Sequence, residues 1–243
     1  SVEGDLAGVA AGIGGVRVGG HTVGAMVRVE WRDRVVVVTI DRPERRNAVD
    51  HETLLALRDA QLAAAAGDAR ALVLTGAPPA FCAGADLTGV ESGEFVDALV
   101  AVLRGFTELA MVTIAAVDGP ALGAGTQLAI ACDLRVATGS SPFGIPAAKL
   151  GLAVDRWTID RLSREFGASI ARAVLLAAQT YTADQLPVTG GGHRAGGLAE
   201  ALVWADELAH LAPLTIRAHK LGLEGLAPPP DVAALQELGL DPG

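Results

Sequence analysis

The chain has 243 residues, which is enough for one sizeable hydrophobic core. Apolar residues make up 51% of it and charged residues 19%, a globular composition that excludes a disordered chain. The net charge of −9 provides no general surface for nucleic acid or an anionic membrane. No uncharged apolar run reaches the roughly 18 residues that a membrane span requires.

The first 25 residues differ from the rest of the chain. Eight of residues 1–25 are glycine, and neither the helical nor the strand period is present. Such a segment loses much conformational entropy on ordering and buries little in return. We therefore expect 1–25 to be a loose Gly/Ala-rich N-terminal tail or upstream sequence, with Met26 as the natural start. Glu3 and Asp5 stand where a signal peptide has lysines, which favours a cytoplasmic location.

Regular patterns begin at Met26. Val27–Glu30 and Val35–Ile40 alternate around a turn at 31–34 and predict a β-hairpin. Asp50 can cap a helix that runs to about residue 66. The leucines expected on the buried side of this helix are Leu54, Leu55, Leu57 and Leu62.

Strands and helices then alternate along the chain. The predicted segments are a buried strand at 71–75, a helix at 93–109, a strand at 112–117, a helix at 124–132 and a strand at 134–137. Units of this kind imply right-handed crossovers and a largely parallel sheet covered by helices, hence the α/β class. Helices dominate from Trp157 onward. We expect a core at 26–192 and a helical C-terminal extension at 193–243.

Two glycine-bearing turns each follow a buried strand and precede a helix. The first is Phe81–Leu87 and the second is Asp118–Leu128. Small residues let another backbone or a ligand come close, and a helix start offers unpaired N–H groups. Tight strand-to-helix packing explains each turn alone, but two adjacent turns can aim one N–H each at a single oxygen. Such an oxyanion hole contributes about 10²–10³ in rate per donor.

Five motifs in order resemble the crotonase, or enoyl-CoA hydratase/isomerase, superfamily. The segments that carry the resemblance are RPERRNA at 42–48, AFCAGADL at 80–87, GPALGAG at 119–125, CDLRVA at 132–137, and FGIP at 143–146 with LGL at 150–152. The resemblance spans about residues 26–220. It implies a spiral of ββα units with a helical C-terminal region, assembled as a homotrimer or a dimer of trimers.

The resemblance also implies a binding site for an acyl-CoA thioester. The backbone N–H groups of Ala85 and Ala124 fall on the two oxyanion-hole positions. The residues that it places against CoA are Arg45, Arg46, Ala48, Ala83, Asp86 and Leu87. No cofactor is implied, because CoA enters as part of the ligand.

This sequence departs from the family where hydration takes place. Hydratases of the family use two glutamates, one as a base toward water and one as an acid toward the α-carbon. Gln127 and Ala147 stand at those positions here. Each acid–base role is worth about 10²–10⁴ in rate, so we expect hydratase activity to be weak or absent.

One carboxylate remains near the predicted site. Asp155 falls where some relatives place a working aspartate, as a base or nucleophile. The simpler explanation is that it caps the helix starting at Arg156. Trp157 replaces a glycine of the family and, with Ala147, is expected to shape the acyl pocket.

The combined pattern resembles a mycobacterial branch of the family that binds fatty acyl-CoA without hydrating it. Our first hypothesis is therefore a non-hydrating protein that presents acyl thioesters to other lipid-synthesis enzymes. The alternatives are an isomerase or thioester hydrolase that uses Asp155, and an ordinary hydratase with an unrecognised base. Relatives usually continue through another helix or two that cover the acyl pocket, so we expect either that the end is missing here or that this cover is shorter, and both would affect trimer contacts and CoA affinity.

Cysteine and histidine point to no further chemistry. Cys82 and Cys132 each lie in an apolar stretch and are expected to be reduced core residues. The five histidines lack the spacing of metal ligands, so no metal site is expected.

Overall fold

The computed structural model describes residues 18–22, 26–86, 93–186, 191–227, 229–230 and 232–233. The strands are β1 Val18–Thr22, β2 Val27–Arg32, β3 Val35–Ile40, β4 Ala71–Gly76, β5 Val112–Val117, β6 Ala121–Leu122, β7 Leu134–Ala137, β8 Pro142–Gly144, β9 Tyr181–Thr182 and β10 Arg194–Ala195. The α-helices are α1 His51–Ala66, α2 Gly93–Glu108, α3 Ala124–Ala131, α4 Arg156–Phe166, α5 Ala168–Leu176, α6 Leu198–Ala209 and α7 Pro213–Leu223. Short 3₁₀ helices are η1 Pro43–Arg45, η2 Pro146–Lys149 and η3 Ala183–Gln185.

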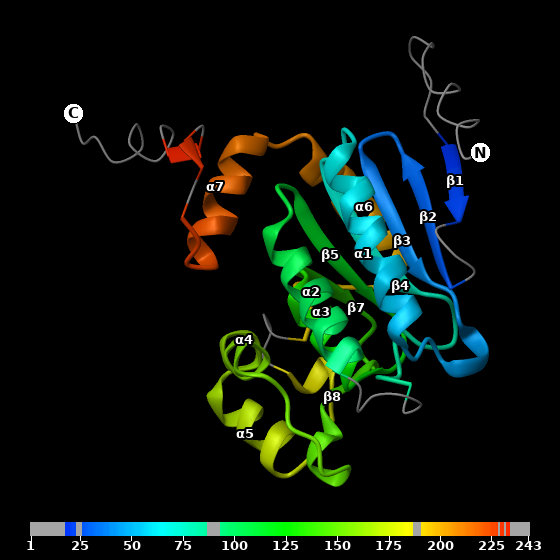
Figure 1. The fold of residues 1–243 in the computed structure, drawn as a ribbon, viewed down its shortest axis with the longest axis vertical. Coiled ribbons are helices and arrows are strands. Elements are labelled where there is room, and N and C mark those ends of the chain that lie inside the picture. Colours follow the sequence, from blue (N-terminus) through cyan, green and yellow to red (C-terminus); the bar gives the residue numbers. More distant parts are fainter. Residues whose placement is uncertain are drawn as a thin grey trace.

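A seven-stranded sheet in the order β1-β2-β3-β4-β5-β7-β10 forms the centre of the molecule (Figure 1). β1, β2 and β3 pair antiparallel, and every later neighbour is parallel. The predicted hairpin and the largely parallel sheet are therefore confirmed, with the hairpin turn narrowed to Asp33 and Arg34.

Alternate residues of the central strands point to opposite faces of the sheet and pack into two separate apolar clusters. Val36 and Val38 of β3 pack with α1, α2 and α3, whereas Val35 packs with the alanines of α6 on the opposite face. Because the sheet is covered on both sides, its inner strands are continuous apolar runs rather than alternating ones.

The predicted α1 is confirmed, together with its cap. The Thr53 N–H donates to Asp50 Oδ1 at 2.8 Å. Leu54 and Leu57 are fully buried, but Leu55 and Leu62 are about half exposed (48% and 52%), so their predicted burial is wrong. They lie seven residues apart, two helical turns, and therefore share the solvent face.

Residues 18–22 correct the expectation of an unstructured N-terminal tail. They form β1, which pairs antiparallel with β2 from Val18 opposite Arg32 to Thr22 opposite Arg28. Backbone hydrogen bonds to the edge of β2 need no side-chain alternation, so the composition gave no sign of this strand. Residues 1–17 and 23–25 lie outside the described part of the chain.

The described part of 193–243 is built into the core. β10 extends the sheet beside β7, and α6 covers the sheet face opposite α1. Lys220 of α7 is buried, and its Nζ donates to Asp133 Oδ2 at 2.8 Å and to the Met111 carbonyl at 3.0 Å. These two bonds hold α7 against the residues that directly precede β5 and β7.

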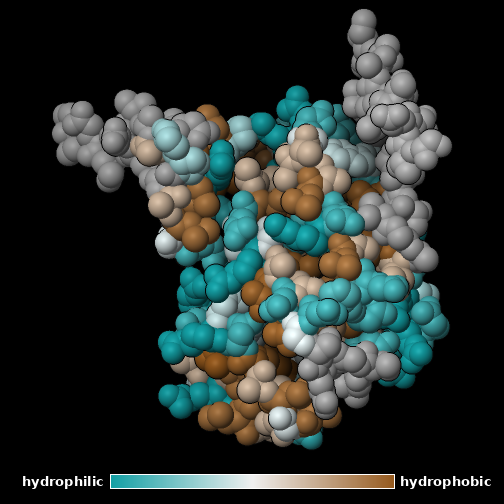
Figure 2. Space-filling view, viewed as in Figure 1, coloured by the Kyte–Doolittle hydropathy of each residue, from teal (hydrophilic) through white to brown (hydrophobic). Residues whose placement is uncertain are grey.

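A smaller sheet, in the order β6-β8-β9, lies beside α4 and α5 at the lower end of the molecule in Figure 1. Apolar side chains gather on the surface at that end (Figure 2). The large exposed apolar residues of this part of the chain are Leu150, Leu152, Ile159 and Leu176. Among the helices in the described ranges, none combines the length and apolarity needed to cross a membrane.

The two buried cysteines allow a prediction about reactivity and pH. Burial raises the pKa of Cys82 and of Cys132 from 9.0 to about 12, because it disfavours the thiolate. Since the thiolate is the reactive form, we expect neither thiol to react with a disulfide reagent in the native protein at neutral pH, and both to react after unfolding.

The same shift predicts the direction of a pH effect on stability. The folded-state pKa exceeds the unfolded value, so this contribution is complete below pH 9.0 and is lost as pH rises toward about 12. Denaturant titrations should show the free energy of unfolding falling across that window. Fast stoichiometric labelling of the native protein would contradict the buried placement.

Candidate functional site

The two glycine turns are joined by backbone hydrogen bonds. Cys82 N donates to the Pro120 carbonyl at 3.0 Å, and Leu122 N donates to the Cys82 carbonyl at 2.9 Å. Beyond these bonds the turns touch at their glycines. A Cβ on Gly123 would lie 3.6 Å from Gly84 Cα, and one on Gly84 would lie 3.2 Å from the Leu122 carbonyl oxygen.

Both turns use a glycine with positive φ, 124° at Gly84 and 54° at Gly123. An L side chain rarely adopts such angles, so glycine permits both the turn and the close approach. Each glycine directly precedes a predicted oxyanion-hole residue, Ala85 or Ala124. Among the described residues, neither of those two N–H groups has an acceptor.

The surrounding chain keeps both turns in place. Val49 N donates to the Gly84 carbonyl, and Asp86 N donates to the Val49 carbonyl. These two backbone hydrogen bonds involve the residues on either side of Ala85 and do not use the Ala85 N–H. On the other turn Gly123 N donates to the Gly144 carbonyl at 2.8 Å. Ala124 is the first residue of α3, where N–H groups have no partner within the helix.

Gln127 lies one turn into α3 and is almost fully buried. Its Nε2 donates to Thr158 Oγ of α4 at 2.9 Å. Helical side chains lean toward the N-terminus, so Gln127 shares the face of α3 that begins at Ala124. Ala147, the other substituted position, is partly buried in η2 and contributes only a methyl group to the core.

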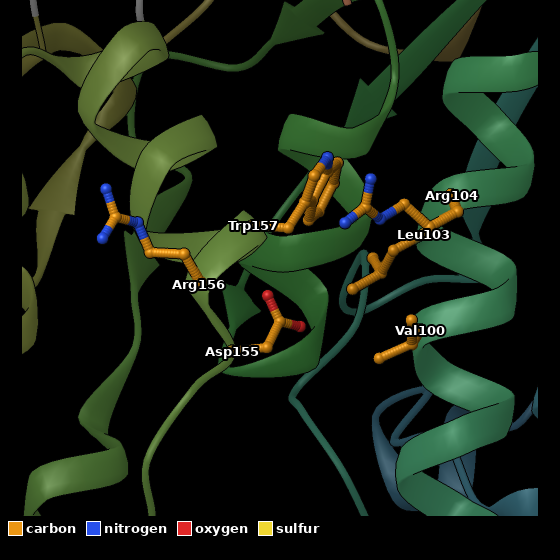
Figure 3. Close-up of a pocket in the computed structure, with 6 residues that line it drawn as sticks. All are labelled: Val100, Leu103, Arg104, Asp155, Arg156 and Trp157. Carbon is orange, nitrogen blue, oxygen red and sulfur yellow. The ribbon is translucent and has the colours of Figure 1, made fainter. Parts of the chain in front are cut away.

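Asp155 caps α4. Its Oδ1 accepts the Thr158 N–H at 2.7 Å, which confirms the simpler of its two predicted roles. The carboxylate also faces a cavity of about 240 Å³ between α2 and the start of α4 (Figure 3). Asp155 therefore both caps α4 and lines the cavity.

The cavity brings together side chains from two helices. Val100, Leu103 and Arg104 of α2 face Asp155 and Trp157, and the Arg104 guanidinium lies 5.6 Å from the Trp157 ring centroid. The predicted pocket residue Trp157 is thus at a cavity. The three α2 residues were not predicted; their i, i+3, i+4 spacing placed them on one helix face without telling which face meets a cavity.

The segments predicted to contact CoA meet at a partly buried arginine, Arg42. Arg42 Nη2 lies 2.9 Å from Asp50 Oδ2 and 3.4 Å from Asp86 Oδ2, and Nη1 donates to the Ala48 carbonyl at 2.5 Å. Arg42 thereby joins residues 42–50 to the first glycine turn. Asp86 is engaged in this pair.

The remaining predicted CoA residues lie around that junction. The side chains of Arg45 and Arg46 are exposed, and Ala83 N donates to the Arg46 carbonyl at 3.0 Å. The buried Asn47, whose Nδ2 donates to the carbonyls of Ala77 and Ala80, supports the same loop. Leu87 lies outside the described residues.

The sheet combines parallel and antiparallel strands, helices cover both of its faces, and two glycine turns meet beyond its strands. This is the crotonase fold. The chain belongs to the enoyl-CoA hydratase/isomerase family, whose model matches residues 30–219. Proteins of this family act on CoA thioesters.

Individual relatives agree with this assignment. The chain is 43% identical over 196 residues to "Probable enoyl-CoA hydratase echA6" of Mycobacterium tuberculosis, covering 80% of this chain and 81% of the relative. The solved structure of enoyl-CoA hydratase EchA1 from Mycobacterium marinum is 34% identical, with a TM-score of 0.76 over 88% of each chain. Pseudomonas aeruginosa DspI is 27% identical, with a TM-score of 0.79 over 90% of this chain and 88% of its own.

The contact between the turns predicts the effect of a single methyl group. A Cβ on Gly125 would lie 2.1 Å from the Cys82 carbonyl oxygen, so Gly125→Ala must push the turns apart. We expect a loss of about 1–3 kcal/mol of unfolding free energy in denaturant titrations.

Gly93→Ala is the matched control, because no atom of the described residues lies within 4 Å of a Cβ there. It should leave stability unchanged or raise it by up to about 1 kcal/mol. Equal stability of the two variants would show that the turns are not in close contact.

Proposed function

We propose that this protein binds the thioester of a fatty acyl-CoA between its two glycine turns and hydrates enoyl thioesters weakly or not at all. The N–H groups of Ala85 and Ala124 are the proposed donors to the thioester oxygen. The contact of Gly84 with Gly123, directly before these residues, is the observation that carries the proposal. It supports an arrangement in which both N–H groups donate to the same oxygen.

The proposed weak hydration follows from side-chain chemistry. The Gln127 amide has no useful basicity, and its Nε2 is already bonded to Thr158. Ala147 has no acid–base group. Loss of both roles, each about 10²–10⁴ in rate, leaves only carbonyl polarisation by backbone donors.

CoA binding is proposed at the junction held by Arg42. The exposed Arg45 and Arg46 supply positive charge for phosphate groups. Ala48, Ala83, Asp86 and Leu87 are proposed to line the same side, with Asp86 acting through its ion pair to Arg42.

The proposal extends to the setting of the protein. Exposed apolar residues around α4 and α5, such as Leu150 and Leu176, support self-association, and we propose a homotrimer or dimer of trimers. We further propose a cytoplasmic protein that presents acyl thioesters to other lipid-synthesis enzymes.

Hydration can be tested by restoring what is missing. With crotonyl-CoA, we expect the wild-type protein to leave the absorbance of the conjugated thioester nearly unchanged, while calorimetry detects binding of hexanoyl-CoA. The variant with Gln127→Glu and Ala147→Glu should gain hydration by about 10² or more, because both acid–base roles return.

Gln127→Glu with Ala147→Gln is the matched control, since it fills the same space with one carboxylate fewer. Its rate should stay well below that of the double glutamate variant. Rapid hydration by the wild-type protein would refute the proposal.

A second candidate function is isomerisation or hydrolysis of a thioester with Asp155 as base or nucleophile. Its favouring observation is that the Asp155 carboxylate faces the cavity while its Oδ1 caps α4 (Figure 3). Asparagine caps as well as aspartate but is not basic, so Asp155→Asn separates the two roles.

Our main proposal predicts that Asp155→Asn binds hexanoyl-CoA like the wild type and keeps its stability. Asp155→Ala should lose about 1 kcal/mol of unfolding free energy with the cap. Turnover of a 3-enoyl-CoA or release of free CoA by the wild type, abolished by Asp155→Asn, would favour the second candidate.

A further inference from the structure

The cavity between α2 and α4 contains an arginine that the proposed function does not use. We propose that this cavity receives an acyl group whose far end carries a carboxylate, and that Arg104 recognises that carboxylate. The inference rests on the proposed function, because it assumes a CoA thioester held at the neighbouring turns. It adds the class of acyl group and the residue that selects it.

Arg104 is a cation without an ionic partner within the described ranges. Its side chain lies over the Trp157 ring, at 5.6 Å from guanidinium carbon to ring centroid. A guanidinium over an indole is held by cation–π attraction yet keeps its N–H groups available at the edges. A planar fork of N–H donors is the geometry that binds a carboxylate with two hydrogen bonds.

Arg156 borders the same cavity but is committed elsewhere. Its Nε lies 2.9 and 2.8 Å from the two carboxylate oxygens of Asp160, and its side chain is 84% exposed. Figure 3 shows it directed away from Arg104 and Trp157. The guanidinium of Arg104 is therefore available to a ligand, whereas that of Arg156 is already paired with Asp160. This difference makes Arg156 a control for Arg104.

The carboxylate of Asp155 is the opposing charge in the cavity. Its Oδ1 accepts the Thr158 N–H, and it lies at the N-terminus of α4, where the helix dipole stabilises negative charge. The negative charge of Asp155 is thus compensated locally, whereas the positive charge of Arg104 is not. A ligand carboxylate placed near Arg104 and Trp157 completes the charge balance.

Size and polarity agree with a short acyl group. A cavity of about 240 Å³ corresponds to about eight water molecules at roughly 30 Å³ each. A six-carbon acyl group that ends in a carboxylate has nine non-hydrogen atoms, six carbons and three oxygens, each comparable to one water. Val100 and Leu103 supply apolar wall for its methylene groups, and Arg104 stands beside them on the same helix.

The test compares two thioesters of equal carbon number. Calorimetric titration of the full chain with adipyl-CoA and hexanoyl-CoA should show tighter binding of adipyl-CoA, about 10- to 100-fold for a charge-assisted pair. Arg104→Met should abolish this preference while leaving hexanoyl-CoA affinity within about twofold. Arg104→Lys should keep part of it, and Arg156→Met, the matched control, should keep all of it.

Three results would overturn the inference, each for a different reason. Equal affinity for both thioesters in the wild type means that the cavity does not recognise the terminal carboxylate of adipyl-CoA. A preference that survives Arg104→Met assigns recognition to another group. Weakening of both thioesters alike by Arg104→Met means that Arg104 contacts a CoA phosphate. If neither thioester binds the wild type, the proposed function itself fails; hexanoyl-CoA binding without discrimination refutes this inference alone.

Discussion

The close contact of two backbone turns is the constraint on which the site depends. Cys82 bonds through both its N–H and its carbonyl to the second turn, and Gly84 lies against Gly123. Both bends have positive φ, and a Cβ on Gly84 would also lie only 3.2 Å from the Leu122 carbonyl oxygen, which is why glycine stands at both. The proposed thioester-binding surface is thus made of main chain, and it does not depend on the two acidic side chains that hydratases of the family use.

The helices around the turns determine what the site can do. α3 begins at Ala124 and presents Gln127, whose amide is held by Thr158 of α4. Asp155 is the N-cap of α4, so one residue both caps that helix and directs a carboxylate at the cavity. The proposed carbonyl site and the cavity that Asp155 borders therefore both lie at helix starts.

Much of this arrangement could be predicted from local sequence. The bounds of β5 and β7 and the two aspartate caps were all correct, because apolar runs and capping chemistry act over a few residues. Contacts between side chains far apart in the sequence were harder to predict. The pairing of Asp86 with Arg42, 44 residues earlier, has no local signal.

The errors also have physical reasons. The leucines of α1 were all assigned to the core, but helical rotation puts Leu55 and Leu62 on the outside. β1 is held by backbone bonds that composition does not record. Arg104 escaped notice because an arginine in an amphipathic helix usually lies on a solvated face, and only the position of α4 shows that a cavity lies there.

Isotope-edited infrared spectroscopy of a bound thioester tests the central claim most directly. With hexanoyl-CoA labelled with ¹³C at the thioester carbonyl, two N–H donors should weaken the C=O bond and lower its stretching frequency relative to free ligand. Ala124→Pro removes one donor at a position where a helix accepts proline, and should reduce that shift. A carbonyl band at the same frequency bound and free, or a shift that Ala124→Pro leaves unchanged, would contradict a thioester held between the two turns.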